Sequence, residues 1–338
     1  MEKELFHHIR LERTANGILR IVWPERDHKS IDFTLYLGPT PDTLNPLSRS
    51  DLVENGRHVE MKNLDPEQRY YAEMVSKGIG SGVFGERRVA CEGTFNFRDL
   101  GGYLTADGRK IKWGKVFRSD GFSGLSEKGL RQLEKTGTRH IIDLRTADEV
   151  KSSPDKVPVD SSISYDHFPV KHGEFNFNHA MERLKQGDAE WLSEAYMVKG
   201  YINSLENYGP IWGKALKTIA GENGRPAVYH CTGGKDRTGT LSALLLLSLG
   251  VPAHTIIADH QLSNVFIADM LPFVFERVKS YGLDPTQVEP YFTAPVKGIS
   301  ALLSHIEMNY GDIKNYLAAQ CGVTAEVVET LQRDLLLT

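Results

Sequence analysis

The first 90 residues consist of short runs in which apolar and polar positions alternate. These runs are rich in β-branched and aromatic residues, and turn sequences such as Asn16-Gly17 and Gly38-Pro39 separate them. Evenly spaced short strands with little helical periodicity are typical of a small β-sandwich, which we expect over residues 1–90. The strands that this pattern predicts are His8–Glu12, Ile18–Trp23, Ile31–Leu37, His58–Met61, Tyr70–Val75 and Val83–Val89.

From Cys91 onward, short apolar runs alternate with segments of helical periodicity. This alternation predicts an α/β domain over residues 91–338, with a parallel central sheet flanked by helices. The expected strands are Ile141–Leu144, Ser162–Val170 and Pro226–Tyr229. The expected helices are Ser126–Thr136, His179–Tyr208, a following helix up to Ile219, Leu241–Leu249, and most of the remaining chain.

Composition and charge narrow the class of protein. A length of 338 residues favours two domains, and a formal net charge of −4 gives no basic field for a nucleic-acid partner. The run Leu241–Leu249 is too short to cross a bilayer, so no stable membrane insertion is expected. Met1–Arg10 has no signal-peptide core, and the three cysteines are widely separated. We therefore expect a cytoplasmic protein, with secretion without a cleavable signal as the alternative.

Candidate chemistry lies in the segment His230–Thr240, with the sequence HCTGGKDRTGT, between an expected strand and an expected buried helix. Such a turn directs backbone N–H groups and the positive end of a helix dipole at one point, which favours anion binding. Gly233 and Gly234 let the backbone curl without a Cβ near the ligand. Arg237, six residues after Cys231, can return across the loop and bind two oxygens of a phosphoryl group.

Cys231 is the candidate nucleophile. Loop dipoles, the helix terminus and nearby cations favour its thiolate, and a thiolate held against a bound phosphate can accept the phosphoryl group. Thr238 can donate a hydrogen bond to the sulfur and help it leave when the phosphocysteine is hydrolysed. The expected phosphate-binding residues are Thr232, Gly233, Gly234, Lys235 and Thr238. The histidines show no clustered ligand spacing, so we expect no metal site, and the reaction needs no cofactor.

Cys-x5-Arg, preceded by His and followed by Thr-Gly, resembles the phosphate-loop signature of the protein tyrosine phosphatase superfamily. Nearly all of residues 91–338 is similar to the bacterial tyrosine phosphatase family that carries HCxxGKDRTG. The similar stretches are FNFRDLGGY, VFRSDGFSGLS, IIDLRTADE, ADHQLSN and HIEMNYGDIKNYL. The resemblance implies a cysteine-dependent phosphatase that acts on phosphotyrosine, often on phosphoserine or phosphothreonine, and in some members on phosphoinositides.

Three alternatives remain beside this interpretation. A rhodanese-type sulfurtransferase also has a loop cysteine, but its loop is usually one residue shorter, which suits a sulfur atom. A phosphoinositide phosphatase docking on membranes is favoured by Lys235 and opposed by the lack of a polybasic stretch. A catalytically silent phospho-binding module is opposed by the presence together of Cys231, Asp236 and Arg237.

The general acid has several candidates. Asp236 can give a proton to the leaving oxygen or brace the loop. Many relatives carry the acid on a movable loop that corresponds to Lys171–Asn178, which contains Glu174 but no aspartate. Asp143 suits an ion pair with Arg145 better. The predicted catalytic residues are therefore Cys231, Asp236 and Arg237.

Roles are also predicted for residues outside the catalytic set. Lys235 is expected to face the substrate, and Arg98 and Asp99 are candidates for positioning the loop. The run Trp191–Leu205 is predicted to serve ordinary packing, although relatives use helices of this region as a lid over the site.

The N-terminal segment Leu64–Tyr70 resembles the corner of fibronectin type III domains, in which a Leu-x-Pro turn leads into a strand opened by Tyr. Trp23 and Tyr36 lie where that family keeps core aromatic residues. The resemblance covers roughly residues 5–90 and implies either a spacer or a dedicated binding role, with no partner indicated.

Overall fold

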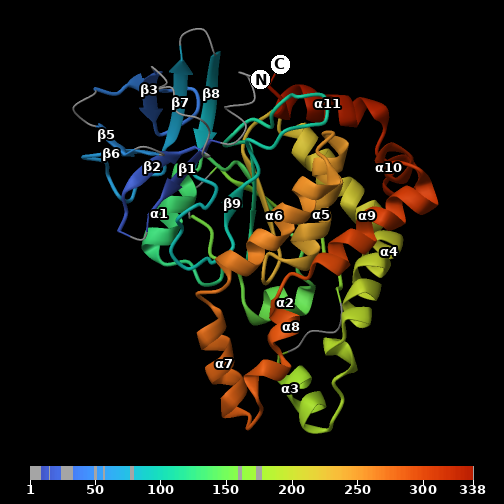
Figure 1. Cartoon of the computed structure of the whole chain (residues 1–338). Helices are drawn as coiled ribbons and strands as arrows, with labels where there is room; N and C mark the ends of the chain where they lie inside the picture. The colour runs from blue at the N-terminus through green and yellow to red at the C-terminus, as the bar shows by residue number, and fades with distance from the viewer. Residues whose placement is uncertain are drawn as a thin grey trace.

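The computed structural model describes residues 9–14, 16–23, 33–48, 52–55, 58–76, 80–158, 162–172 and 177–337 (Figure 1). Within these residues the chain forms three sheets. Two of them lie side by side in the N-terminal part, and the third lies among the helices that follow (Figure 1).

Two four-stranded antiparallel sheets form the N-terminal part, with strand orders β1-β2-β6-β5 and β4-β3-β7-β8. Leu19 and Ile21 of one sheet and Leu35 and Met74 of the other belong to one buried cluster, because alternate residues of a strand share a face. The strands are β1 (Arg10–Arg13), β2 (Leu19–Val22), β3 (Phe33–Gly38), β4 (Asn45–Pro46), β5 (Leu52–Asn55), β6 (His58–Met61), β7 (Tyr71–Ser76) and β8 (Gly80–Gly85).

The expected β-sheets of the N-terminal part are thereby confirmed. The sequence pattern missed β4, which has only two residues, and β5. His8 and Ile31, the first residues of two expected strands, lie outside the described residues.

The region after Cys91 is built around a five-stranded sheet in the order β12-β11-β13-β10-β9. Four of these strands are parallel, and β9 pairs antiparallel with β10. The sheet is therefore mixed, which corrects the prediction of a parallel sheet at one two-residue edge strand. The strands are β9 (Arg98–Asp99), β10 (Val116–Ser119), β11 (His140–Asp143), β12 (Ser164–His167) and β13 (Ala227–His230).

Helices cover both faces of this sheet. Ile142 and Tyr229 join the cluster formed with α4, α5 and α9, whereas their neighbours Ile141 and Val228 pack with Leu133 of α1. The helices are α1 (Glu127–Lys135), α2 (Ala147–Ser152), α3 (Phe177–Lys185), α4 (Glu194–Gly221), α5 (Asp236–Ser248), α6 (Ala253–Phe266), α7 (Leu271–Ser280), α8 (Glu289–Phe292), α9 (Val296–Tyr310), α10 (Ile313–Cys321) and α11 (Ala325–Leu335). In Figure 1, α3, α7 and α8 extend away from the sheet at its lower end.

The stretch His179–Tyr208, expected to be one helix, is divided between α3 and α4, with a short 3-10 turn at Glu190–Leu192 between them. The break expected near Tyr208 is instead a kink within α4. Tyr208 has non-helical φ and ψ, two residues before Pro210, and a proline inside a helix is an ordinary cause of a kink. None of the described helices combines the length and hydropathy that crossing a membrane requires.

The β-sandwich packs directly against β9. Arg69 donates through Nη2 to Asp99 Oδ2 at 2.7 Å and to the carbonyl oxygen of Glu86 at 2.8 Å. The indole ring of Trp113 lies against Gly85, where an added Cβ would come within 2.8 Å of the ring. The chain therefore keeps close contacts across residue 90, and the division into 1–90 and 91–338 stays a prediction.

Candidate active site

Within the segment His230–Thr240, residues 231–235 join the central strand β13 to α5, and we call them the phosphate loop after the binding role that the sequence predicts. Cys231, the first residue after β13, is only 3% exposed. Thr238, in the first turn of α5, donates through Oγ1 to Cys231 Sγ at 3.1 Å. The strand-loop-helix geometry thus brings the candidate nucleophile beside a hydroxyl donor and the amino end of a buried helix.

Two buried side chains turn the peptide groups of the loop. Asn96 donates through Nδ2 to the carbonyl oxygens of Gly233 and Gly234, both at 3.0 Å, and Arg118 donates to that of Gly234 at 2.8 Å. In a trans peptide the N–H points opposite to the carbonyl, so these bonds turn the next amides away from Asn96 and Arg118. In the hydrogen bonds among described residues, no amide of residues 232–235 is a donor. These N–H groups suit an anion.

The need for glycine differs between the two glycine positions of the loop. Gly234 has φ of +64°, and a Cβ there would lie 2.5 Å from the carbonyl oxygen of Ser119, so both conformation and space require glycine. At Gly233 a Cβ would meet nothing within 4 Å among the described residues. The close approach of the backbone therefore concerns Gly234 alone.

Arg237 is held by Glu149, a residue the sequence analysis did not single out. Its Nη1 and Nη2 donate to the two carboxylate oxygens of Glu149 at 2.6 and 2.7 Å. Thr232 also donates to Glu149, at 2.5 Å. Nε of Arg237 makes no hydrogen bond with the described residues, so the edge of the guanidinium that carries Nε can meet phosphoryl oxygens.

The ionisation of Glu149 follows from this pairing. Burial raises the pKa of Glu149, but the hydrogen bonds and the charge of Arg237 outweigh it and bring the pKa to about 2. Glu149 also completes a capping box with Thr146 at the start of α2. That Thr-x-x-Glu spacing was readable in the sequence, but it predicts a helix start and gives no sign of a bond to Arg237.

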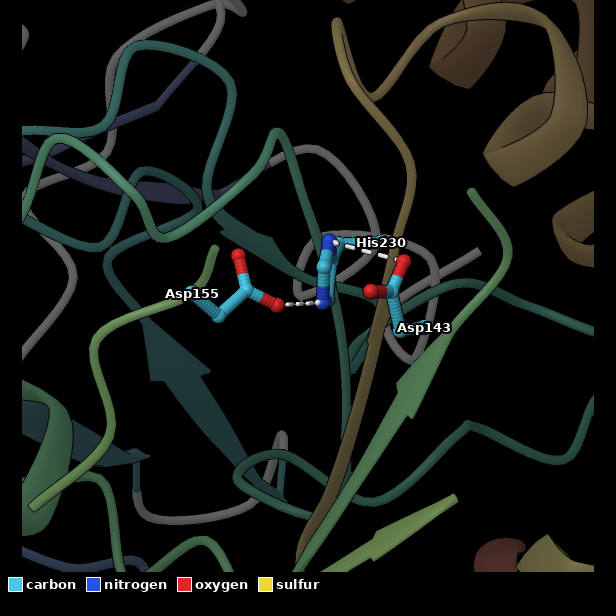
Figure 2. A group of neighbouring side chains, drawn as sticks. All are labelled: Asp143, Asp155 and His230. Atoms are coloured by element: carbon cyan, nitrogen blue, oxygen red, sulfur yellow. Dashed lines mark ion pairs between the residues drawn. The ribbon is translucent and has the colours of Figure 1, made fainter. Parts of the chain in front are cut away.

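His230, the last residue of β13, lies between two carboxylates from other segments of the chain (Figure 2). Its Nε2 is 3.0 Å from Asp155 Oδ2, and its Nδ1 is 3.9 Å from Asp143 Oδ1. The three side chains could offer ligand atoms to a metal ion, all within 4.8 Å of one another. Arg145 Nη2, however, lies 2.8 Å from both carboxylates and supplies the positive charge. The group is an ion-pair network that fixes the ends of β11 and β13.

Asp236 lies at the start of α5, with its side chain 23% exposed. Oδ1 accepts a hydrogen bond from Tyr201 at 2.7 Å, and Oδ2 is 3.4 Å from Lys235 Nζ. Burial raises the pKa of Asp236, but the charges of Lys235 and His172 and the bond from Tyr201 outweigh it, so the net shift is downward. Asp143 is fully buried, and Glu174 lies outside the described residues.

Lys235 contacts the chain around α8. Its Nζ donates to the carbonyl oxygens of Thr293, at 2.7 Å, and of Tyr291. Tyr291 is close enough to the loop that the charges of Asp236 and Arg237 act on its pKa, which burial raises. The ammonium expected to face the substrate thus also connects the loop to the segment that follows α8.

Arg98 and Asp99 lie on opposite sides of β9. Arg98 donates through Nε to Asp259 Oδ1 at 3.1 Å, and Arg118 donates to Oδ2 of the same carboxylate at 2.7 Å. Arg98 also donates to the side chain of Asn96, which holds the carbonyl oxygens of Gly233 and Gly234, so one residue links Arg98 to the loop. Asp99 instead pairs with Arg69 of the sandwich. Breaking a buried pair of this kind typically costs about 3–5 kcal/mol.

Comparison with known proteins identifies a matching family and several similar proteins. A family model described as "Tyrosine phosphatase family" matches residues 89–337. A chain of Cupriavidus necator, whose name assigns it provisionally to the tyrosine-protein phosphatases, is 28% identical over 73% of this chain and 89% of its own length.

Two further relatives are similar over much of their length. The triple specificity protein phosphatase PtpB of Mycobacterium tuberculosis is 26% identical over 72% of this chain and 97% of its own. A tyrosine-protein phosphatase of Nostoc commune is 27% identical over 62% of this chain and 69% of its own.

Proposed function

The chain belongs to the tyrosine phosphatase family, and from that membership we propose that Cys231 carries the phosphoryl group during hydrolysis of phosphate monoesters. The chain is a cysteine-dependent protein-tyrosine phosphatase. The observation that most strongly supports the role of Cys231 is its contact with Thr238 at 3.1 Å, beside loop amides that donate to no described residue.

In the first proposed step, Cys231 Sγ attacks phosphorus, the S–P bond forms and the P–O bond to the leaving group breaks. Asp236, protonated for this step, gives its proton to the leaving oxygen. Arg237, through Nε, and the amides of residues 232–235 stabilise the equatorial oxygens as negative charge shifts onto the leaving group.

In the second proposed step, a water molecule attacks phosphorus and the S–P bond breaks. Asp236, now ionised, takes a proton from that water, and Thr238 donates to the departing sulfur. The downward pKa shift of Asp236 favours this second role, because it keeps the carboxylate ready as a base. Inorganic phosphate leaves, and the thiolate is restored.

The proposed substrate is a phosphorylated protein, with phosphotyrosine and also phosphoserine or phosphothreonine as substrates. Dual specificity agrees with the family and with the similarity to a phosphatase named for triple specificity. A phosphoinositide phosphatase and a silent phospho-binding module are not favoured by these comparisons. The free thiols of Cys91, Cys231 and Cys321 support the proposed location in the reducing cytoplasm.

The fibronectin type III-like character of residues 1–90 is also part of the proposal. Two observations support it: the pair of four-stranded antiparallel sheets and the corner at Tyr70. There the phenol oxygen of Tyr70 accepts a hydrogen bond from the backbone N–H of Asp65 at 3.1 Å.

Acid quench of the enzyme during turnover of a ³²P-labelled phosphotyrosine peptide tests the role of Cys231. We expect label on Cys231 as a thiophosphate ester, and none in Cys231→Ser, which should still bind vanadate. Chelators should leave the rate of the wild-type protein unchanged. Label on another residue, or substantial turnover by Cys231→Ser, would refute the proposed nucleophile.

A further inference from the structure

Tyr201, on α4, is a completely buried residue whose hydroxyl lies at the active site. The hydroxyl donates to Asp236 Oδ1 at 2.7 Å and lies 3.1 Å from Nε2 of His260 on α6. These three residues come from three different helices. Their polar atoms therefore meet only in the folded protein.

The direction of these hydrogen bonds follows from the protons available. A phenol has one proton, and the one of Tyr201 goes to the carboxylate of Asp236. Burial lowers the pKa of His260 to about 3, so its ring is neutral and carries a single N–H. Because the oxygen of Tyr201 must accept from His260, that N–H is on Nε2. The hydrogen bonds thus run from His260 to Tyr201 to Asp236.

Neighbouring residues leave the phenol ring of Tyr201 little freedom. A Cβ at Gly298 of α9 would lie 2.6 Å from the ring, so α9 approaches it as closely as a glycine permits. The ring of His172 packs edge-on against that of Tyr201, with centroids 5.2 Å apart. Gly239 of α5 makes room for His260, since a Cβ there would lie 2.8 Å from Nδ1. The hydroxyl is held in place before any substrate binds.

We propose that Tyr201, held by His260, is a positioning residue that occupies Oδ1 of Asp236 and leaves Oδ2 as the oxygen that gives and takes the proton. This inference rests on the proposed role of Asp236. It adds a residue that orients the carboxyl group of Asp236 and determines which of its two oxygens exchanges the proton with the substrate.

The charged and titratable groups around Asp236 set the expected pH effect. They are Lys235, His172, Tyr201, His260 and Tyr291. A hydrogen bond donated to a carboxylate stabilises its ionised form, so removal of the Tyr201 hydroxyl raises the pKa of Asp236. The protonated acid then persists to higher pH. For a substrate whose leaving oxygen needs that proton, the basic limb of the pH–rate profile moves to higher pH.

The test combines Tyr201→Phe, Asp236→Asn and the double variant, with kcat/KM measured across both limbs of the pH profile. The substrates are a phosphotyrosine peptide and p-nitrophenyl phosphate, whose leaving group needs less protonation. We expect Tyr201→Phe to lower kcat/KM on the peptide about tenfold, the size of one lost hydrogen bond to a charged group, and less on the aryl ester. The basic limb on the peptide should move to higher pH.

Tyr316→Phe is the matched control. Tyr316 is also completely buried, and its hydroxyl donates to the carbonyl oxygen of Leu205, on α4, at 2.9 Å. We expect its pH profile to match that of the wild-type protein. If Tyr316→Phe shifts the basic limb as far as Tyr201→Phe does, the effect is structural and the inference is wrong.

The double variant separates the inference from the proposed function. If Tyr201 acts through Asp236, Tyr201→Phe should change kcat/KM less than twofold in the Asp236→Asn background, because the group that it positions is gone. An equal loss in both backgrounds overturns the role of Tyr201 alone. If Asp236→Asn shows no dependence on the leaving group, the proposed role of Asp236 fails, and the positioning role fails with it.

If Tyr201→Phe does not fold, which loss of vanadate binding would show, a second variant provides the test. His260→Leu removes the donor that holds the phenol and leaves Tyr201 and Asp236 unchanged. We again expect the basic limb on the peptide to move to higher pH. An unchanged profile in a His260→Leu protein that binds vanadate would overturn the inference.

Discussion

Glu149 binds Arg237 through both of its carboxylate oxygens, at 2.6 and 2.7 Å from the two Nη atoms. A bidentate pair of this kind fixes the plane of the guanidinium as well as its position. Arg237, which we propose binds the phosphoryl group, is therefore oriented before a substrate arrives, by a carboxylate that lies 88 residues earlier in the chain.

Glu149→Gln should lower kcat/KM on all phosphate monoesters by about tenfold to a hundredfold. The amide keeps the shape of the side chain but can accept from only one Nη, so the arginine loses its fixed orientation. Steady-state kinetics on the peptide and the aryl ester measure this loss. Equal losses on both substrates are expected, and a loss confined to the peptide would contradict a role in holding Arg237.

The same residue predicts a pH dependence of stability. The pKa of Glu149 falls from an ordinary value of 4.5 to about 2 in the folded protein. Its contribution to the free energy of unfolding is therefore present above pH 4.5 and lost as the pH falls toward 2. Urea unfolding at several pH values should show a shallower loss of stability in Glu149→Gln over that window. Identical slopes for the two proteins would contradict the pairing.

Gly234→Ala and Gly233→Ala form a matched pair of variants. Gly234 has φ of +64°, and its Cβ would lie 2.5 Å from a backbone oxygen, whereas nothing described lies within 4 Å of a Cβ at Gly233. We expect Gly234→Ala to lower the thermal midpoint and abolish vanadate binding, while Gly233→Ala keeps the thermal midpoint of the wild-type protein. Calorimetry with and without vanadate distinguishes them. Equal destabilisation by both variants would mean that the backbone conformation and close contacts of Gly234 do not explain its need for glycine.

Arg69→Met should destabilise the chain by about 3–5 kcal/mol, because it leaves the fully buried carboxylate of Asp99 without its cation. Lys128→Met is the control, since Lys128 pairs with Glu67 at the surface and such pairs contribute about 0–1 kcal/mol. Urea unfolding measures both. A small effect of Arg69→Met would show that the sandwich and β9 are only loosely coupled, and a chain starting at Cys91 should then keep full stability.

Lys235→Met should weaken the connection between the phosphate loop and the chain after α8. The ammonium donates to the carbonyl oxygens of Tyr291 and Thr293, which the thioether cannot replace. Hydrogen exchange at residues 289–295 should accelerate, and KM should rise about tenfold. Lys297→Met, which removes an exposed pair with Glu194, should leave both unchanged. Unaltered exchange in Lys235→Met would indicate that Lys235 serves the substrate alone.

Local sequence determined much of what could be predicted. The cap of α1 is one case, since Ser126 accepts from the backbone of Gly129 as its position before the helix suggests. The strand-turn-helix arrangement around Cys231 is another, because β13, a glycine-rich turn and the buried helix α5 follow one another without interruption. In both cases the interacting residues lie close together along the chain.

The remaining parts depend on contacts that no local pattern encodes. Strand β10 was missed because Arg118 interrupts its apolar run, and the partners that make that burial tolerable, Asp259 and the carbonyl oxygen of Gly234, are distant in the sequence. Tyr201 lies in the run Trp191–Leu205, whose periodicity indicates packing, and its partners Asp236 and His260 are 35 and 59 residues away. The role of such residues can be recognised only in the folded structure, where the helices that carry them are in contact.

The contact between Gly239 and His260 bears on how the loop motif evolves. Gly239 is the last glycine of the motif, yet what it accommodates is an imidazole from α6, so its identity depends on packing and not on the phosphate. Positions 239 and 260 should therefore change together among homologous chains. A chain that keeps the cysteine and the arginine but has a larger residue at 239 should have a smaller one at 260, and it would need another group to hold the tyrosine.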